Sequence, residues 1–191
     1  YGVLSGMKNR ALSTVACAMY RDFKPQLLYW GAAKSHHHNC YAGLLYHTYR
    51  MVKNAIQLTG IYTDANADLV VTGCALHDIG KLKELETDEL GISEYTIDGS
   101  LFGHLFIGAE LVKHYCHKCS VPKDVERELA HIIVSHHQNL EWGAITRPAS
   151  LEAFLVSQID HIDSQAYVYE KECSTMEPGT ISDNYALGGI K

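Results

Sequence analysis

The sequence predicts an all-α protein, and three observations favour that class. Apolar residues recur three and four positions apart along several segments, which is the spacing of one helix face. The alternation of apolar and polar residues that is typical of strands is almost absent. Glycine and proline are sparse, with 15 and 4 among 191 residues, and we find neither an internal repeat nor a low-complexity segment, so one continuous domain is the simplest organisation.

The helical spacing assigns the elements in order. An amphipathic stretch predicts a helix at residues 10–20, and further apolar stripes predict helices at residues 44–56, 69–76, 107–115, 125–133 and 151–162. The stripe at residues 69–76 is too short to cross a membrane and therefore predicts a buried helix of a soluble domain. Residues 91–99, with a turn at Asp98-Gly99, predict a loop or a short hairpin.

These elements divide the chain into three parts. We expect an N-terminal helical extension at residues 1–31, the main helical domain at residues 32–170 and a tail at residues 171–191. From residue 178 onward, the sequence predicts a tail that is mobile or makes another contact.

Composition excludes several classes of protein. The chain is 47% hydrophobic and 20% charged and has no apolar run near the ~18 residues of a membrane span, so we expect no integral membrane protein. The net charge of −6 argues against strong electrostatic binding of nucleic acid by this chain alone. Six scattered cysteines and a start without a signal peptide predict a cytoplasmic protein. The 12 histidines are the one unusual feature.

Five polar residues fall on apolar helix faces that should point into the core: His47, His77, His104, His136 and Asp160. Taken alone, each histidine is more often a core residue bonded to a carbonyl, and the aspartate more often pairs with a cation. Together they are harder to explain, because a buried carboxylate costs several kcal/mol unless a cation compensates it, and the stripes offer few basic partners. A divalent metal ion would satisfy the whole set.

Two adjacent pairs strengthen this interpretation. The pair His77-Asp78 can reach a shared ion, or Asp78 can bridge two ions, and His136-His137 is a second such pair. Mixed imidazole and carboxylate ligation suits manganese, iron, zinc or similar ions. Asp163, one turn after Asp160, is interpreted as a carboxylate that caps a helix or orients a ligand histidine.

The same residues resemble a known family. The segment HDIGK at residues 77–81, with His47 before it and Asp160 after it, is similar to the signature of the HD-domain metal-dependent phosphohydrolase superfamily. The segments GHLFIGAELV, SHHQNLEWGAITRP and QIDHIDSQA, at residues 103–112, 135–148 and 158–166, are most similar to the HD domain of the YhaM-type 3′-to-5′ exoribonucleases. This resemblance implies a helical HD-domain bundle at residues 32–170 that binds divalent metal and hydrolyses phosphate esters.

The resemblance also implies roles for individual residues. It makes His47, His77, Asp78 and Asp160 the core metal ligands and His104, His136 and His137 the ligands that complete a second site. Because Gly43 stands where some three-metal relatives have a ligand glutamate, we expect two ions, with manganese favoured over iron, zinc, nickel, cobalt and magnesium. Lys81 would act in catalysis beside Asp78 by donating to the substrate phosphate or the leaving oxygen. Arg147 and His38 are further candidates for contacts to the substrate.

The leading hypothesis is a phosphohydrolase that cleaves phosphodiester bonds of RNA or short oligonucleotides through a metal-activated hydroxide. A small-nucleotide phosphatase or phosphodiesterase is the first alternative, favoured by the net charge of −6 and by the lack of a barrel-like strand pattern, typical of an oligonucleotide-binding domain, before residue 32. A non-catalytic HD module that binds a nucleotide or a partner protein is the second alternative, and a broken ligand set would mark it. A homo-oligomer is left open.

Overall fold

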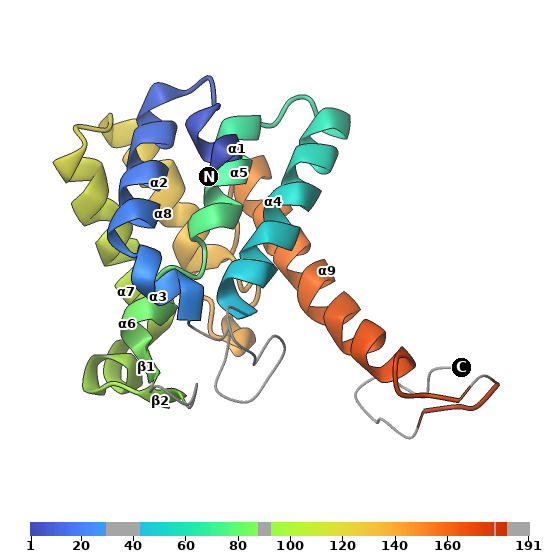
Figure 1. Ribbon diagram of the computed structural model, residues 1–191. Helices are drawn as coiled ribbons and strands as arrows, with labels where there is room; N and C mark the ends of the chain where they lie inside the picture. Colours follow the sequence, from blue (N-terminus) through green and yellow to red (C-terminus); the bar gives the residue numbers. More distant parts are fainter. Residues whose placement is uncertain (30–42, 88–92, 178, 183–191) are drawn as a thin grey trace.

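The computed structural model describes residues 1–29, 43–87, 93–177 and 179–182. Over these ranges the protein is a bundle of α-helices with one short hairpin, which confirms the predicted all-α class (Figure 1). The elements are α1 (Gly2–Ser5), α2 (Arg10–Asp22), α3 (Lys24–Tyr29), α4 (Gly43–Ile61), α5 (Ala67–Leu76), α6 (Lys81–Glu84), β1 (Leu85–Thr87), β2 (Ser93–Tyr95), α7 (Ile97–Lys118), α8 (Lys123–Ser135), the 3-10 helix η1 (Leu140–Trp142) and α9 (Leu151–Cys173). In the described part of the chain, no helix is both long enough and apolar enough for a membrane span.

Side-chain caps explain where several helices begin. Asn9 accepts hydrogen bonds from the first amides of α2, and Asn66 does the same for α5. Thr96 and Ser150 cap α7 and α9 in the same way. Because the first amides of a helix have no partner within it, each of these caps stabilises its helix by ~1 kcal/mol and sets its start.

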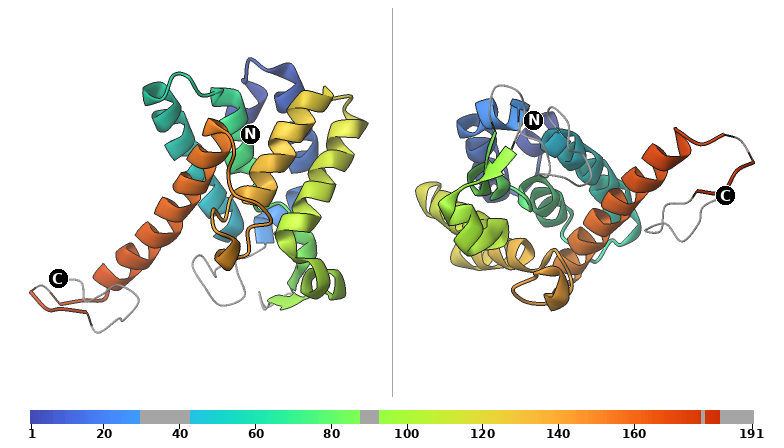
Figure 2. Two further views of the ribbon diagram at one scale, coloured as in Figure 1. Left: turned by 180° about the vertical axis from the view of Figure 1, so that it is seen from behind. Right: turned by 90° about the horizontal axis from the view of Figure 1, so that it is seen from below.

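The short helix α5 lies at the centre of the bundle. It packs against α2, α4, α8 and α9, and the view from below shows these helices around it (Figure 2). Every residue from Leu69 to Leu76 is buried, which confirms the predicted buried helix. A Cβ on Gly73 would lie 2.9 Å from Ile132 of α8 and 3.0 Å from Val156 of α9, so these helices meet closely at a position that suits glycine. This packing carries the C-terminal end of α5 into the interior.

The N-terminal helices share the core of the rest of the molecule. Helix α2 packs against α5 and α7, and its Leu12, Val15 and Met19 are fully buried in the same apolar cluster. At the other end, α9 continues to Cys173, and its last turns project away from the bundle (Figure 1). The boundaries at residues 31 and 170 stay predictions.

The hairpin lies earlier in the chain than predicted. Strands β1 and β2 pair antiparallel, with Leu85 opposite Tyr95, and residues 88–92 between them lie outside the described ranges. The prediction of a turn at Asp98-Gly99 was wrong, because these residues form the first turn of α7. The Thr96 hydroxyl accepts a hydrogen bond from the Gly99 amide and so starts a helix there.

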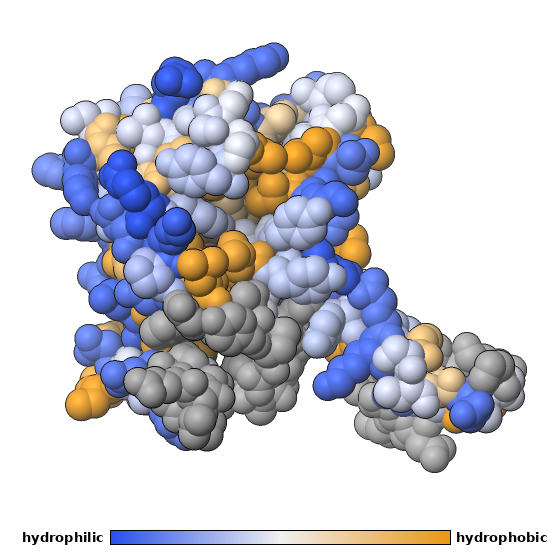
Figure 3. Space-filling view, in the orientation of Figure 1, coloured by the Kyte–Doolittle hydropathy of each residue, from blue (hydrophilic) through white to orange (hydrophobic). Residues whose placement is uncertain are grey.

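An apolar groove of about 650 Å³ lies between α1 and α4. Apolar surface gathers in the corresponding region of Figure 3. The described residues lining it include Val3, Leu4, Leu45, Tyr49 and Val52, and none of them is a predicted site residue. The predicted site therefore lies elsewhere on the bundle.

Candidate metal centre

The seven predicted metal ligands lie together where α4, α5, α7, α8 and α9 meet. Their ligand atoms form three overlapping groups, each with its atoms within 4.8 Å of one another. We call His47, His77 and Asp160 the inner group and His104, His136 and His137 the outer group. The third group, of His77, Asp78 and His136, joins these two.

The two adjacent pairs reach the centre because each follows the end of a helix. His77 caps the C-terminus of α5, and its Nδ1 donates to the carbonyl of Cys74, 2.9 Å away. His136 caps α8 in the same manner, with Nδ1 donating to the carbonyl of Ile133 at 2.8 Å. The chain leaves the helix just after each cap, so the next residue also turns its side chain to the centre.

The inner group is packed closely. The Nε2 atom of His47 lies 3.2 Å from Nε2 of His77 and 3.3 Å from Oδ1 of Asp160. Both histidine side chains are almost completely buried, at 0% and 1% exposure. Three potential ligand atoms, two from imidazoles and one from a carboxylate, thus converge from α4, α5 and α9.

Asp78 faces both groups. Its Oδ2 lies 3.1 Å from Nε2 of His77, while its Oδ1 lies 3.5 Å from Nε2 of His104 and 3.7 Å from Nε2 of His136. In the outer group, Nε2 of His104 and Nε2 of His137 are 3.3 Å apart. A carboxylate with one oxygen toward each group has the arrangement of a bridging ligand.

Each of the five histidines is oriented through its Nδ1. For His47, His77, His104, His136 and His137 the partners are Asp163, the Cys74 carbonyl, Glu84, the Ile133 carbonyl and the Trp142 carbonyl, at 2.7, 2.9, 3.1, 2.8 and 3.0 Å. Carbonyls and ionised carboxylates only accept, so Nδ1 carries a proton in each ring, and Nε2 presents a lone pair to the centre whenever the ring is neutral. Five Nε2 atoms directed at one centre form a donor set that suits a metal ion.

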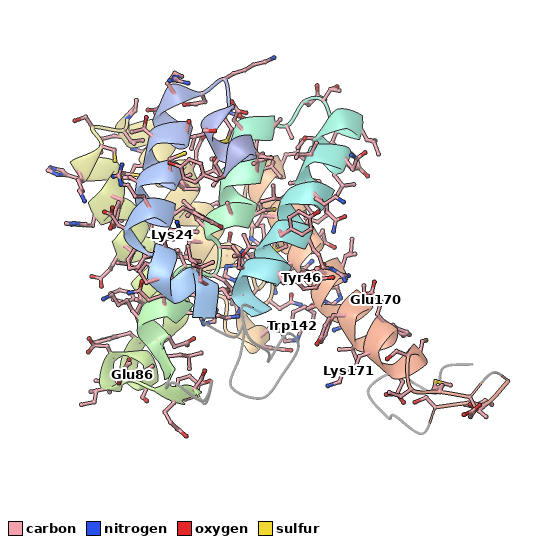
Figure 4. All side chains as sticks on the ribbon, viewed as in Figure 1. Lys24, Tyr46, Glu86, Trp142, Glu170 and Lys171 are labelled. Atoms are coloured by element: carbon pink, nitrogen blue, oxygen red, sulfur yellow. The ribbon has the colours of Figure 1, made fainter. Side chains whose placement is uncertain are left out.

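A chain of ion pairs holds His47 from behind. Asp163 of α9 is fully buried, and its second oxygen lies 2.6 Å from Nε of Arg50. Arg50 also forms an ion pair with Glu170, at 2.6 Å. Figure 4 labels Glu170 on the projecting part of α9. Of the two interpretations of Asp163, the contacts favour the one in which it orients a histidine, and Arg50 fixes that carboxylate in turn. The role of His47 as a metal ligand stays a prediction.

The outer His104 is positioned by α6 and a kink in α7. Gly103 has φ 70° and ψ 161°, which interrupts α7 just before His104 and is a conformation that favours glycine. The carboxylate of Glu84 accepts from both the amide and Nδ1 of His104, at 3.0 and 3.1 Å. A Cβ on Gly80 would collide with the His104 carbonyl, so the two backbones can approach only with glycine at this position.

Charges within the inner group shift the pKa values of His47 and Asp160. Burial opposes protonation of His47, but hydrogen bonds to Asp160 and Asp163 outweigh it and raise its pKa to about 9. Burial raises the pKa of Asp160, but the hydrogen bond from His47 and the nearby imidazoles hold it below its usual range. At neutral pH a proton on His47 therefore compensates the buried carboxylates, and a metal ion at the inner group would have to displace it.

Around Asp78, burial and charge act in opposite directions. Burial raises the pKa of Asp78, but the charges of Lys81 and His77 hold it well below its usual range. Burial lowers the pKa of His136 well below its usual range and, with the charge of His104, also lowers the pKa of His137. Asp78 is thus ionised and lies beside the neutral imidazoles of His136 and His137, which are the protonation states that bind metal.

Two buried atoms support a metal in this centre. Oδ1 of Asp78 and Nε2 of His136 are both buried and have no hydrogen-bond partner in the described part of the chain. An unpaired buried polar atom costs about 1–3 kcal/mol, and more if it is charged. These two atoms face each other at 3.7 Å, and a cation between them would satisfy both.

A cavity of about 210 Å³ opens beside the centre. Asp78, His136, His137 and Asp160 line it together with Lys81, whose Nζ lies 2.7 Å from Oδ2 of Asp78. Burial lowers the pKa of Lys81, but the negative charge of Asp78 raises it more, so the ammonium stays charged. The cavity thus offers metal-binding groups and a cation to the same ligand.

The structure does not bring the other predicted substrate contacts into this cluster. Arg147 is exposed, and it is not among the described residues that line the cavity. His38 lies outside the described residues.

Sequence reasoning missed four residues around the centre: Arg50, Glu84, Trp142 and His161. Arg50 lies three positions after His47, a spacing that could have indicated it. Trp142 and His161 lie within the motifs quoted above, close to His137 and Asp160. Glu84 lies 20 positions before His104, where no periodic pattern connects the two.

The fold and the site together define the class of protein. It is an α-helical bundle in which histidines and aspartates from five helices form a centre suited to divalent metal. The family model of the HD domain matches residues 44–165, and the chain belongs to this HD domain family. The matched range contains all seven of the clustered residues.

The curated relatives point the same way. The chain is 32% identical over 177 residues to the 3′-5′ exoribonuclease YhaM of Listeria welshimeri, 31% over 179 residues to that of Oceanobacillus iheyensis and 28% over 177 residues to that of Bacillus velezensis. Each match covers 93% of this chain but only 55 to 56% of the relative. No solved structure gave a significant match. The family and these relatives support the prediction of a hydrolytic enzyme.

Proposed function

We propose that this chain is a phosphohydrolase that depends on two divalent metal ions, one at the inner group and one at the outer group. The observation that carries the proposal is the position of Asp78. Its two oxygens face the two groups, and Oδ1 is buried without a hydrogen-bond partner among the described residues. Membership of the HD domain family supports the same assignment.

The residues divide into clear roles under this proposal. His47, His77 and Asp160 would hold the inner ion, His104, His136 and His137 the outer ion, and Asp78 would contact both. When bound, such ions lower the pKa of a coordinated water and polarise a phosphoryl oxygen. Manganese is our favoured metal, because it accepts both imidazole and carboxylate ligands.

Lys81 would bind the phosphate of the substrate. Its ammonium group lines the cavity and lies beside Asp78, so it faces the space that a phosphoryl group would occupy. A fixed positive charge at that place would stabilise the negative charge that develops on the phosphoryl oxygens. Asp78 holds the ammonium in position in turn.

RNA or a short oligonucleotide is the substrate that we favour. The relatives of this chain from Listeria, Oceanobacillus and Bacillus are named 3′-5′ exoribonucleases, and the matches cover almost the whole of this chain. The chain spans little more than half the length of those relatives, so RNA as substrate rests on the shared HD domain. A cytoplasmic location and self-association remain predictions alongside it.

A small nucleotide is the second candidate substrate. Lys81 is the one lysine or arginine among the described residues that line the cavity, and the whole chain has a net charge of −6. A long polyanion usually requires a basic track, whereas one phosphate group needs only local charges. These observations favour a nucleotide-sized substrate if the chain acts alone.

A gel assay separates these proposals. The purified chain would be incubated with a 5′-labelled single-stranded oligoribonucleotide and Mn²⁺, beside the Asp78→Ala variant and the Asp64→Ala control at an exposed turn. We expect a ladder of shortened products from the wild type and the control, and intact RNA from Asp78→Ala. Intact RNA together with phosphate release from AMP would favour the second candidate. Neither activity in a metal-loaded protein would favour a non-catalytic module.

A further inference from the structure

An exposed tryptophan lies at the rim of the candidate metal centre. Trp142 ends the short helix η1, is 53% exposed and lines the same cavity as Asp78 and Lys81. Figure 4 labels it below the N-terminal end of α4. An isolated exposed aromatic ring is common on protein surfaces, so its meaning depends on how it is held.

The backbone of Trp142 is fixed to the centre. Its carbonyl accepts the hydrogen bond from Nδ1 of His137, at 3.0 Å. The loop after it is tied back to α8, because the Ile145 amide donates to the Val134 carbonyl at 3.0 Å, and Ala144 in this loop is buried. The indole therefore keeps a defined position relative to the outer group.

His161 supports the indole from α9. The two rings are nearly parallel, with an interplanar angle of 11° and centroids 5.6 Å apart. His161 directly follows Asp160 of the inner group and lines the cavity as well. The Trp142–His161 pair is thus attached to both halves of the centre, one ring through His137 and the other through Asp160.

The size of the cavity indicates what this pair could contact. Pockets that enclose a small molecule usually have volumes of at least ~300 Å³. The cavity of about 210 Å³ is smaller, and the groups that line it are suited to a phosphate. The remainder of a phosphate ester would extend past its rim, where the half-exposed indole lies.

We propose that the Trp142–His161 pair is a stacking platform for the nucleobase of the substrate, next to the phosphate that the centre binds. The inference rests on the proposed function and adds to it a feature that selects the substrate class. The pair would favour a nucleotide, or the end of a nucleic acid, over a phosphate ester that has no base. Stacking tolerates every base, because each has a π face. The platform therefore predicts selection for a base without strong selection for one sequence.

Two ligands that differ only in the base test this inference. Isothermal calorimetry of the Mg²⁺-loaded protein would compare AMP with ribose 5-phosphate, with chromatography to verify that both remain intact. We expect AMP to bind at least about tenfold more tightly to the wild type, and the Trp142→Ala variant to bind both with similar affinity. Trp142→Phe should keep most of the preference, and Tyr62→Ala, at an exposed aromatic residue near the far end of α4, should keep all of it.

Fluorescence gives an independent readout. The sequence has two tryptophans, so Trp30→Phe leaves Trp142 as the single reporter. We expect AMP, and not ribose 5-phosphate, to change the emission of Trp142. Equal binding of the two ligands by the wild type would overturn the platform, as would a Trp142→Ala variant that weakens both equally.

Metal content distinguishes this failure from failure of the proposed function. Trp142→Ala keeps the backbone carbonyl that orients His137, so we expect its bound metal to equal that of the wild type. If the base preference is absent while metal binding and phosphohydrolase activity are present, only the platform is wrong. If the wild type binds no divalent metal and hydrolyses no phosphate ester, the proposed function fails, and the platform with it.

Discussion

The inner and outer groups of the centre use the same kinds of side chain but are supported differently. His47 of the inner group is fully buried and is held by Asp163, which is itself fully buried and paired with Arg50. His104 and His137 of the outer group are partly exposed, and their orientation depends on Glu84 and on the carbonyl of Trp142 in a loop. His47 of the inner group thus has two successive layers of support, whereas His104 and His137 of the outer group each have one.

This difference has a functional meaning. Ligands that are buried and already fixed in place reorganise little when an ion binds, so the free-energy cost of binding is small. They also exclude water, and both effects favour tight binding of the ion. Ligands near an open cavity leave room for a substrate oxygen and for exchange of the ion. We therefore expect the inner group to retain its ion and the outer group to present its ion to the phosphate.

The largest effect is expected where the groups meet. Replacing Asp78 with alanine removes the carboxylate between them, so both ions should be lost and turnover should fall by at least about a thousandfold. Elemental analysis of the purified protein and an activity assay would measure the two effects, with Asp64→Ala as the control. Retained metal together with retained activity would contradict the role of Asp78.

Separate substitutions in the two groups sharpen the comparison. His47→Ala should remove the tightly bound ion, while His137→Ala should leave one tightly bound ion and raise the metal concentration needed for activity about 100-fold. Titration with Mn²⁺ followed by elemental analysis after gel filtration would show which ion survives. If His47→Ala keeps the tighter ion, the proposed order of affinity is reversed.

The supporting carboxylates should have smaller effects. Asp163→Asn keeps the shape of the side chain but weakens its bonds to His47 and Arg50, so metal affinity or activity should fall about 10- to 100-fold. Glu84→Gln, on the outer side, should lower the affinity of the outer ion alone. Circular dichroism would verify that both variants fold. Equal losses at both sites from either variant would show that support is not divided in this way.

The smallest difference expected between the two groups is in how strongly protons compete with the metal ion for their histidines. The pKa of His47 is raised to about 9, so a metal ion must displace its proton at neutral pH, and inner affinity should rise about tenfold per pH unit up to about 9. Burial and the charge of His104 lower the pKa of His137, so above pH ~7 its proton should not compete with the outer ion. Chelator competition at pH 7 and 8 in His137→Ala and His47→Ala would compare the two slopes. The same slope in both variants would contradict the comparison.

The sequence was sufficient for much of the fold and for the candidate ligands that cluster in the centre. His47, His104 and Asp160 were found because they interrupt apolar helix faces, which must converge in an all-α bundle. The hairpin was misplaced because the cap at Thr96 extends α7 over Asp98-Gly99. The Asp-Gly pair at residues 98–99 is only a local turn signal, and the hydrogen bond from the Gly99 amide to the Thr96 hydroxyl overrides it.

The supports of the centre were harder to predict, because they depend on tertiary contacts. Glu84 meets His104 only through the kink at Gly103 and the close backbone approach at Gly80. Arg50 pairs with residues on α9 more than 100 positions later, as the separation of 113 between Arg50 and Asp163 shows. Periodicity reports which face of a helix is buried, but it does not report which distant side chain lies opposite.

The most direct test of the central claim is anomalous diffraction from crystals of this chain grown with Mn²⁺. We expect two anomalous peaks about 3.5–4 Å apart, one coordinated by His47, His77 and Asp160 and the other by His104, His136 and His137, with Asp78 touching both. A single peak at the inner group would reject the two-ion account. Crystals with saturating Mn²⁺ and no peak in the centre would contradict a metal-dependent site altogether.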